Sequence, residues 1–75
     1  MSTPIVIVDD PQYGPMLKVV DVELADRFED FLAEHCYVLF DTRFEEVGMS
    51  FLFGQASSVG KVRSLYERFL HAEAG

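Results

Sequence analysis

The stretch "FGQASSVGKVR", residues 53–63, has the residue types of a phosphate-binding loop, with glycines, two serines and a Gly-Lys pair ahead of a predicted helix. A Walker loop separates its two glycines by four residues and follows the lysine with Ser or Thr, because backbone amides wrap the phosphates and the hydroxyl binds magnesium. Here five residues separate Gly54 from Gly60, and Val62 occupies the hydroxyl position. The stretch therefore does not predict nucleotide hydrolysis.

A weaker hypothesis applies to the same turn. Free amides at the start of a helix can hold a small anion, and Ser57, Ser58 and Lys61 are placed where they could assist. The structural interpretation is that Gly54 ends a strand, that one of the two serines caps the helix, and that Lys61 is a solvated side chain. We favour the structural interpretation and keep Ser57, Ser58 and Lys61 as a weak anion-binding site.

The neighbouring pair His35 and Cys36 has the residue types of a metal site or of a nucleophile with its base. Adjacent residues on a helix point about 100° apart, so one such pair does not supply two aligned ligands. A structural zinc site takes about four Cys or His ligands, and the chain has one cysteine and two histidines. We expect a core histidine and a small buried thiol, with no metal and no cofactor.

Carboxylates are abundant, and paired acids such as Asp9-Asp10 and Glu45-Glu46 can serve as general acids or bases. Almost all of them fall where the pattern predicts solvent exposure. We interpret them as solvated charges and assign no catalytic residue.

Length and charge limit the classes of function. A chain of 75 residues predicts one domain, residues 1–75. Thirteen acidic and six basic residues give a net charge of −7, which repels nucleic-acid phosphates and anionic lipids and argues against direct binding to either. A single cysteine, no basic signal-peptide start and no apolar run near the ~20 residues of a membrane span predict a cytoplasmic location.

Hydrophobic periodicity predicts the elements that must position these residues. Strands are expected in residues 4–10 and 16–20, a helix from Asp21 to His35 or Cys36, two strands in residues 37–55 with a turn at Glu45 to Gly48, and a helix from Ser57 or Ser58 to about Ala72. The first run is apolar on both faces, which favours an interior strand, although an extended arm is the alternative. The fold class is α+β, a two-layer sandwich of an antiparallel sheet with three to four strands and two amphipathic helices on one face, in the order ββαββα or βαββα.

Two further patterns bear on this architecture. The stretches "FEDFL" (28–32) and "YERFL" (66–70) match in their core positions, which leaves a duplication of two ββα halves open. Alternation along residues 37–55 predicts one strand face for the core. The residues expected on that face are Val38, Phe40, Phe44, Val47, Met49, Phe51 and Phe53.

The opposite face predicts a partner. Tyr37, Leu39, Leu52 and one alternate set from Ile5 to Val8 point away from the helices, and an apolar face of this size usually marks an interface. A second copy would cover it, so we expect a homodimer that stacks sheet on sheet. Asp26, Glu29 and Asp30 form an acidic surface on the first helix that could bind a basic protein.

The sequence predicts only a broad class of function. The absence of a catalytic constellation and the presence of the apolar face favour a non-enzymatic protein-interaction or regulatory module. The alternative is a small-ligand or anion-binding domain, with or without catalysis, whose site lies at the 54–61 turn or in the dimer cleft.

Overall fold

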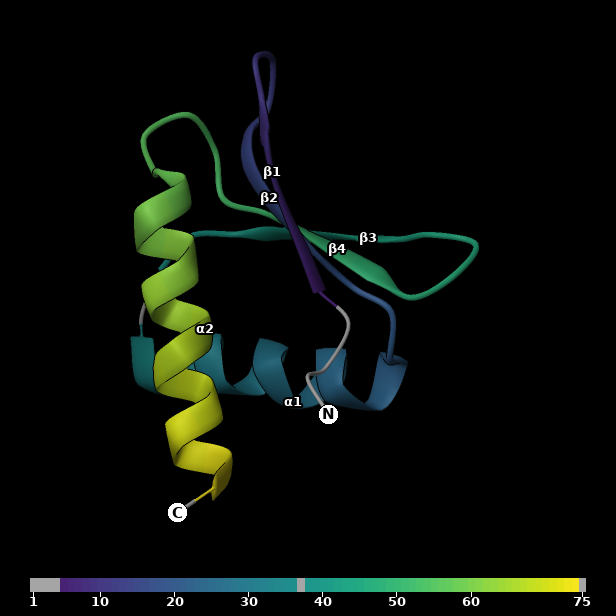
Figure 1. The fold of residues 1–75 in the computed structure, drawn as a ribbon, viewed down its shortest axis with the longest axis vertical. Helices are drawn as coiled ribbons and strands as arrows, with labels where there is room; N and C mark the ends of the chain where they lie inside the picture. Colours follow the sequence, from purple (N-terminus) through teal and green to yellow (C-terminus); the bar gives the residue numbers. More distant parts are fainter. Residues whose placement is uncertain (1–4, 37, 75) are drawn as a thin grey trace.

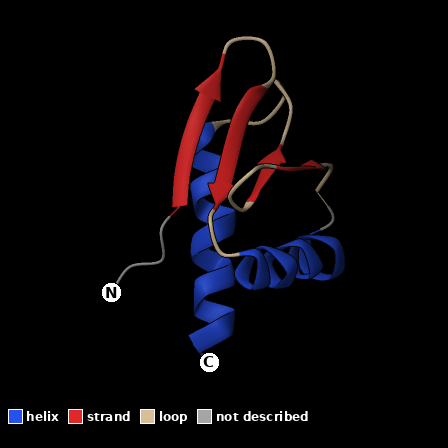
Figure 2. Cartoon of the chain, turned by 90° about the vertical axis from the view of Figure 1, so that its right-hand side faces the viewer, coloured by secondary structure: helices blue, strands red, loops and turns tan. Residues whose placement is uncertain are grey.

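The computed structural model describes residues 5–36 and 38–74 and shows an α+β fold. The four strands form one antiparallel sheet in the order β1-β2-β4-β3, and both helices pack on one side of it (Figures 1 and 2). The predicted order ββαββα is confirmed, and residues 5–10 form a strand rather than an arm. The elements are β1 (Ile5–Asp10), β2 (Gly14–Val19), α1 (Val22–Phe31), the π-helical turn η1 (Leu32–Cys36), β3 (Asp41–Phe44), β4 (Met49–Leu52) and α2 (Val59–Ala74).

β1 and β2 form a hairpin whose turn contains Pro11. The carboxylate of Asp10 accepts hydrogen bonds from the backbone N–H groups of Gln12 (2.8 Å) and Tyr13 (2.9 Å), which fixes the turn. β1 lies at an edge of the sheet, so the prediction of an interior strand is wrong. Only one face of its apolar run is used for the core: the odd-numbered side chains Ile5 and Ile7 face the helices, whereas Val6 on the other face is 55% exposed.

α1 begins at a side-chain cap and presents one apolar stripe to the sheet. Oδ1 of Asp21 accepts from the backbone N–H of Glu23 (3.0 Å), and Leu24, Ala25 and Phe28 are buried. The helical path continues through η1, so the predicted end near Cys36 is confirmed.

His35 does not lie in the core, and that prediction is wrong. The side chain is exposed, and its ring centroid lies 5.5 Å from that of Phe31. In a π-helical turn the hydrogen bonds span five residues, so the side chains beyond Leu32 lose the phase of the 3.6-residue stripe. Cys36 is half-buried.

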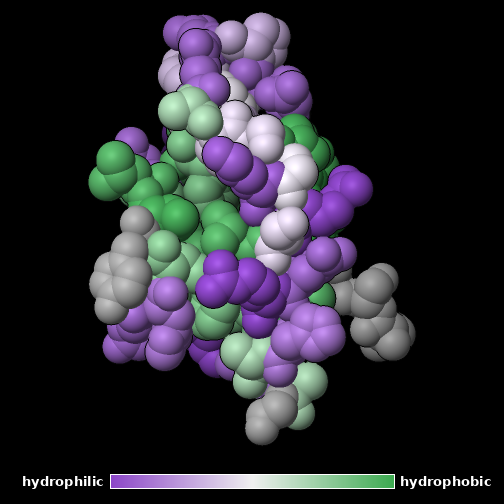
Figure 3. Space-filling view, turned by 90° about the vertical axis from the view of Figure 1, so that its left-hand side faces the viewer, coloured by the Kyte–Doolittle hydropathy of each residue, from purple (hydrophilic) through white to green (hydrophobic). Residues whose placement is uncertain are grey.

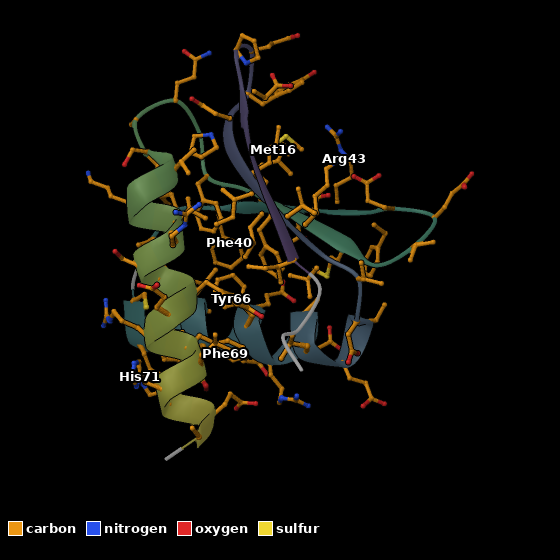
Figure 4. The ribbon with its side chains drawn as sticks, in the orientation of Figure 1. Met16, Phe40, Arg43, Tyr66, Phe69 and His71 are labelled. Carbon is orange, nitrogen blue, oxygen red and sulfur yellow. The ribbon has the colours of Figure 1, made fainter. Side chains whose placement is uncertain are left out.

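The core lies between the sheet and the helices, with Phe28 of α1 at its centre. Its ring makes edge-on contacts with Phe51 of β4 (5.0 Å between centroids), Phe69 of α2 (5.2 Å) and Tyr66 of α2 (5.4 Å). In Figure 4, Phe40 and Tyr66 lie between α2 and the sheet, and Phe69 lies lower, where α2 passes α1. Phe28 therefore contacts both β4 and α2, and these aromatic contacts help to hold the two layers together.

β3 and β4 form the second hairpin, with its turn at Glu45 to Gly48 as predicted. Gly48 has φ +83°, and the backbone N–H of Glu45 donates to the carbonyl oxygen of Gly48 (3.2 Å). Phe44 and Val47, predicted for the core, are 73% and 68% exposed, so the prediction is wrong for both. The reason is position: β3 is the other edge strand, and the hairpin tip projects away from α2 (Figure 1).

Candidate functional site

A surface groove of about 690 Å³ lies between residues 38–39 and the first half of α2. On the face that Figure 3 shows, apolar side chains gather beside hydrophilic ones. We call this hollow the α2 groove. It is lined by Val38, Leu39, Phe53, Ala56, Ser57, Ser58, Gly60, Lys61, Ser64, Leu65 and Arg68.

The apolar part of the α2 groove comes from both layers of the fold. Phe53, just beyond β4, is buried, and Val38 and Leu65 are half-buried against the core. Leu39 stands at the rim and is 93% exposed, more than any other large apolar side chain in the part of the chain that the structure describes. The groove therefore has an apolar wall and, at its rim, one leucine that is almost fully exposed.

The charged part of the α2 groove is entirely basic. Among the described residues, Lys61 and Arg68 are the only charged ones in the lining, and they lie two turns apart on α2 with Ser64 and Leu65 between them. Residues spaced i, i+3, i+4 and i+7 share one side of a helix, which is why the four form one wall. In a chain of net charge −7, this wall is a local concentration of positive charge.

The turn that leads into α2 is held by local hydrogen bonds. The backbone N–H of Ser57 donates to the carbonyl oxygen of Gly54 (3.1 Å), and Oγ of Ser58 accepts from the backbone N–H of Lys61 (3.2 Å). Ser58 is thus the helix cap, which confirms the structural interpretation of this serine. All three residues of the predicted weak anion site line the α2 groove, and anion binding itself stays a prediction.

The predicted interface residues lie on three separate surfaces. Leu39 is on the rim of the α2 groove, whereas Leu52 is half-buried on the outer face of the sheet, the face turned away from the helices, opposite Met16 and Asp41 in the strand register. Tyr37 lies outside the described residues. The acidic set is on α1, where Asp26 and Asp30 are exposed and Glu29 is half-buried.

The outer face of the sheet is less open than the strand pattern predicts. Met16 is only 7% exposed, and Ser50 is fully buried. The guanidinium of Arg43 lies 5.7 Å from the ring centroid of Tyr13, and both Arg43 and Met16 are on the side of the sheet away from α2 (Figure 4). Part of this face is therefore buried within the single chain, and on β1 its apolar residues Val6 and Val8 are exposed.

Arg68 lines the α2 groove, although sequence reasoning did not assign it to any site. Its signal was the spacing from Lys61, seven residues along the same helix, with the helix's apolar core stripe on another side. What the spacing does not show is that residues 38–39, in the segment between η1 and β3, lie against this wall.

Within residues 5–36 and 38–74, no group of three or more His, Cys, Asp or Glu side chains is arranged to hold a metal ion. Among the helices that the structure describes, none combines the length and the apolar character that a membrane crossing requires. Comparisons with protein-family models, with curated proteins and with solved structures found no significant match to this chain.

Proposed function

We propose that the protein is a non-enzymatic interaction module whose α2 groove receives an acidic segment of a partner protein that carries an apolar side chain. The observation that carries the proposal is the exposure of Leu39, 93%, beside a lining whose only charges are Lys61 and Arg68. As part of the same proposal, the protein acts in the cytoplasm, where its one thiol, Cys36, stays reduced.

The apolar component supplies the affinity in this proposal. Burying a leucine side chain contributes about 1.5–3 kcal/mol, and Leu39 has almost its whole surface available for this. Gly60 and Ser64 lie in the same wall and carry little or no side chain, so a partner's backbone can approach α2 closely.

The charged component supplies the selectivity. Lys61 and Arg68 face the groove with no acid in the lining, whereas the rest of the chain is strongly acidic. Complementary charge steers association and rejects wrong partners more than it adds affinity. A basic segment would meet these two cations without any compensating acid, so we expect discrimination against it.

An open groove suits a protein segment better than a small molecule. Sites for small ligands bury most of the ligand surface, whereas the leucine at the rim of this groove is almost fully exposed. A small-anion site at Ser57, Ser58 and Lys61 is the second candidate, and the convergence of these three residues in one groove favours it. Oγ of Ser58 already accepts a hydrogen bond from the backbone N–H of Lys61, so this N–H is not free to bind an anion.

A displayed library of random peptides tests the proposal. Selection on the wild type should enrich peptides that combine Asp or Glu with Leu or Phe, and an enriched peptide, labelled with a fluorophore, then gives binding curves by anisotropy. Leu39→Ser and the double variant Lys61→Glu/Arg68→Glu should each weaken binding about tenfold or more. Arg63→Glu is the matched control, because Arg63 is exposed on α2 but does not line the groove, and it should bind like the wild type.

Two results would overturn the proposal: enrichment of basic or purely apolar peptides, or equal binding by the groove variants and the control. A separate measurement addresses the second candidate. If phosphate or acetate raises the melting temperature of the wild type but not of Lys61→Ala, the groove is a small-anion site instead.

A further inference from the structure

β3 is an edge strand whose outer side is open. It pairs with β4 on one side, and all four of its side chains are exposed. No other strand in residues 5–36 and 38–74 pairs with its free edge. An uncovered edge presents unpaired N–H and C=O groups and is a template for pairing with another chain.

The backbone groups on that free edge belong to alternate residues. The N–H of Glu45 donates to the carbonyl oxygen of Gly48, and the β3–β4 register continues this pairing to Arg43 with Ser50 and Asp41 with Leu52. Hydrogen-bonded and non-hydrogen-bonded pairs alternate along an antiparallel ladder. Thr42 and Phe44 therefore direct their N–H and C=O groups toward the free edge, and the same alternation, continued by one residue, assigns Phe40 to that edge.

The residues of this edge form a self-complementary sequence. Residues 40–44 read Phe-Asp-Thr-Arg-Phe, with an aromatic residue at each end, an acid and a base inside them, and Thr42 at the centre. When such a strand pairs antiparallel with its own copy about Thr42, Phe40 lies opposite the copy's Phe44, and Asp41 lies opposite the copy's Arg43. Every pair is then an aromatic pair, an opposite-charge pair or a Thr-Thr pair, which are the stabilising cross-strand combinations.

We propose that two copies of the chain form a two-fold dimer by antiparallel pairing of β3 with β3 about Thr42. The residues with edge-facing backbone groups are then the ones that pair by hydrogen bonds. Asp41 and Arg43 fall in the non-hydrogen-bonded pairs, where Cα atoms are about 4.5 Å apart and side chains approach most closely.

The side chains of β3 fit this arrangement on both faces of the sheet. On the helix side, Phe44 is 73% exposed, whereas Phe40 is half-buried against Phe51, so the copy's Phe44 extends an existing aromatic cluster. On the outer side, the β3–β4 register places Asp41 and Arg43 on the same face of the sheet, and the Arg43 guanidinium lies 5.7 Å from the centroid of the Tyr13 ring. In the dimer, the exposed ring of Phe44 thereby gains the copy's Phe40 as a partner.

The other edge of the sheet does not offer the same complementarity. β1 carries two acids, Asp9 and Asp10, and no base, so self-pairing would gather charges of one sign. The outer face, where sequence reasoning placed the dimer contact, already buries Met16 and Ser50 within one chain. The β3 edge is therefore the surface on which a second copy fits best, and this inference does not depend on the proposal for the α2 groove.

Sedimentation equilibrium tests the dimer, with the wild type expected at twice the monomer mass of 8.5 kDa. Arg43→Glu and Asp41→Arg each place like charges opposite one another and should weaken the dimer about tenfold or more. The double variant Asp41→Arg/Arg43→Asp restores an opposite pair with the signs exchanged, so it should return to within about threefold of the wild type. Arg63→Glu on α2 makes the same charge change as Arg43→Glu away from the edge and should leave the dimer unchanged.

A backbone variant provides an independent test. Thr42→Pro removes one N–H from the free edge and none from the ladder with β4, because the Thr42 N–H points away from β4. A folded monomer by circular dichroism and sedimentation is the expected result. A monomeric wild type at millimolar concentration, a dimer that survives both Arg43→Glu and Thr42→Pro, or a double variant no better than either single one would overturn the proposal.

Discussion

The hydroxyl of Ser50 donates a 2.7 Å hydrogen bond to Oε1 of Glu45, across the hairpin that joins β3 to β4. Ser50 is fully buried although it lies on the sheet face that carries no helix, and Glu45 is exposed at the turn. The bond thus connects a buried polar group to a charged acceptor five residues away. It connects the turn of the β3–β4 hairpin to β4. The free edge of the same hairpin is the surface on which we propose that the dimer forms.

Loss of the donor or of the acceptor in this bond should have different costs. Glu45→Ala leaves the buried hydroxyl without its acceptor and should lower the free energy of unfolding by about 1–3 kcal/mol, whereas Ser50→Ala should cost about 1 kcal/mol. Urea denaturation measures both. Glu45→Gln keeps an acceptor oxygen and is the control, and a Glu45→Ala variant as stable as the wild type would show that this bond contributes nothing.

Two glycines with the same backbone angle should respond differently to alanine. Gly48 and Gly54 both have φ +83°, but a Cβ on Gly48 would overlap the carbonyl oxygen of Val19 and lie 2.7 Å from Cα of Val20, whereas a Cβ on Gly54 meets nothing within 4 Å. Gly54→Ala should cost about 1–2 kcal/mol from the left-handed backbone alone. Gly48→Ala should cost about 3 kcal/mol or more, because backbone atoms must also move. Equal melting temperatures for the two variants would contradict this account.

Alanine substitution of two phenylalanines, one buried and one exposed, should also have very different effects on stability. Phe28→Ala removes the centre of the aromatic core and should cost about 3–5 kcal/mol, enough to unfold much of a domain of this size. Phe44→Ala removes a side chain that is 73% exposed, and at low protein concentration it should change the free energy of unfolding by less than about 0.5 kcal/mol. Circular dichroism at increasing temperature measures both, and a large loss of stability for Phe44→Ala in the monomer would mean that the ring packs within its own chain.

The ion pair between the helices should contribute little. Nε of Arg27 on α1 lies 2.7 Å from Oε1 of Glu73 near the end of α2, and the two side chains are 53% and 41% exposed. Exposed pairs contribute about 0–1 kcal/mol and are screened by salt. Arg27→Gln should therefore lower stability by less than about 1 kcal/mol at low salt, and by still less at 1 M sodium chloride. A difference from the wild type that grows with salt would rule out an electrostatic origin.

The elements could be predicted because their signals are local. The Asp21 cap, the Ser58 cap and the turn at Gly48 depend on residues within about four positions of one another. The apolar stripes of α1 and α2 likewise follow from periodicity. Phe44, Val47 and His35 were misplaced because their burial depends on how far the helices extend over the sheet, and on a π-helical turn that a 3.6-residue period does not represent.

The candidate site could be predicted only in pieces. Ser57, Ser58 and Lys61 were placed together by their spacing, and Leu39 by alternation along its strand, but as members of two different sites. The structure combines them in the α2 groove and adds Arg68, while it separates Leu39 from Leu52. No spacing in the chain shows that residues 38–39 lie against the first half of α2.

By itself, the sequence determined the α+β class, the two helices with their caps and the turn of the second hairpin, and it left open whether the first segment is a strand or an arm. Each of these follows from backbone preferences and from contacts between near neighbours. Only the tertiary structure decided that β2 and β4 are central, that the edge strand β3 displays its self-complementary residues, and that a leucine and two cations share one groove. Those relations join residues far apart in the chain, and they are set by how two layers pack around Phe28 rather than by any pattern within one segment.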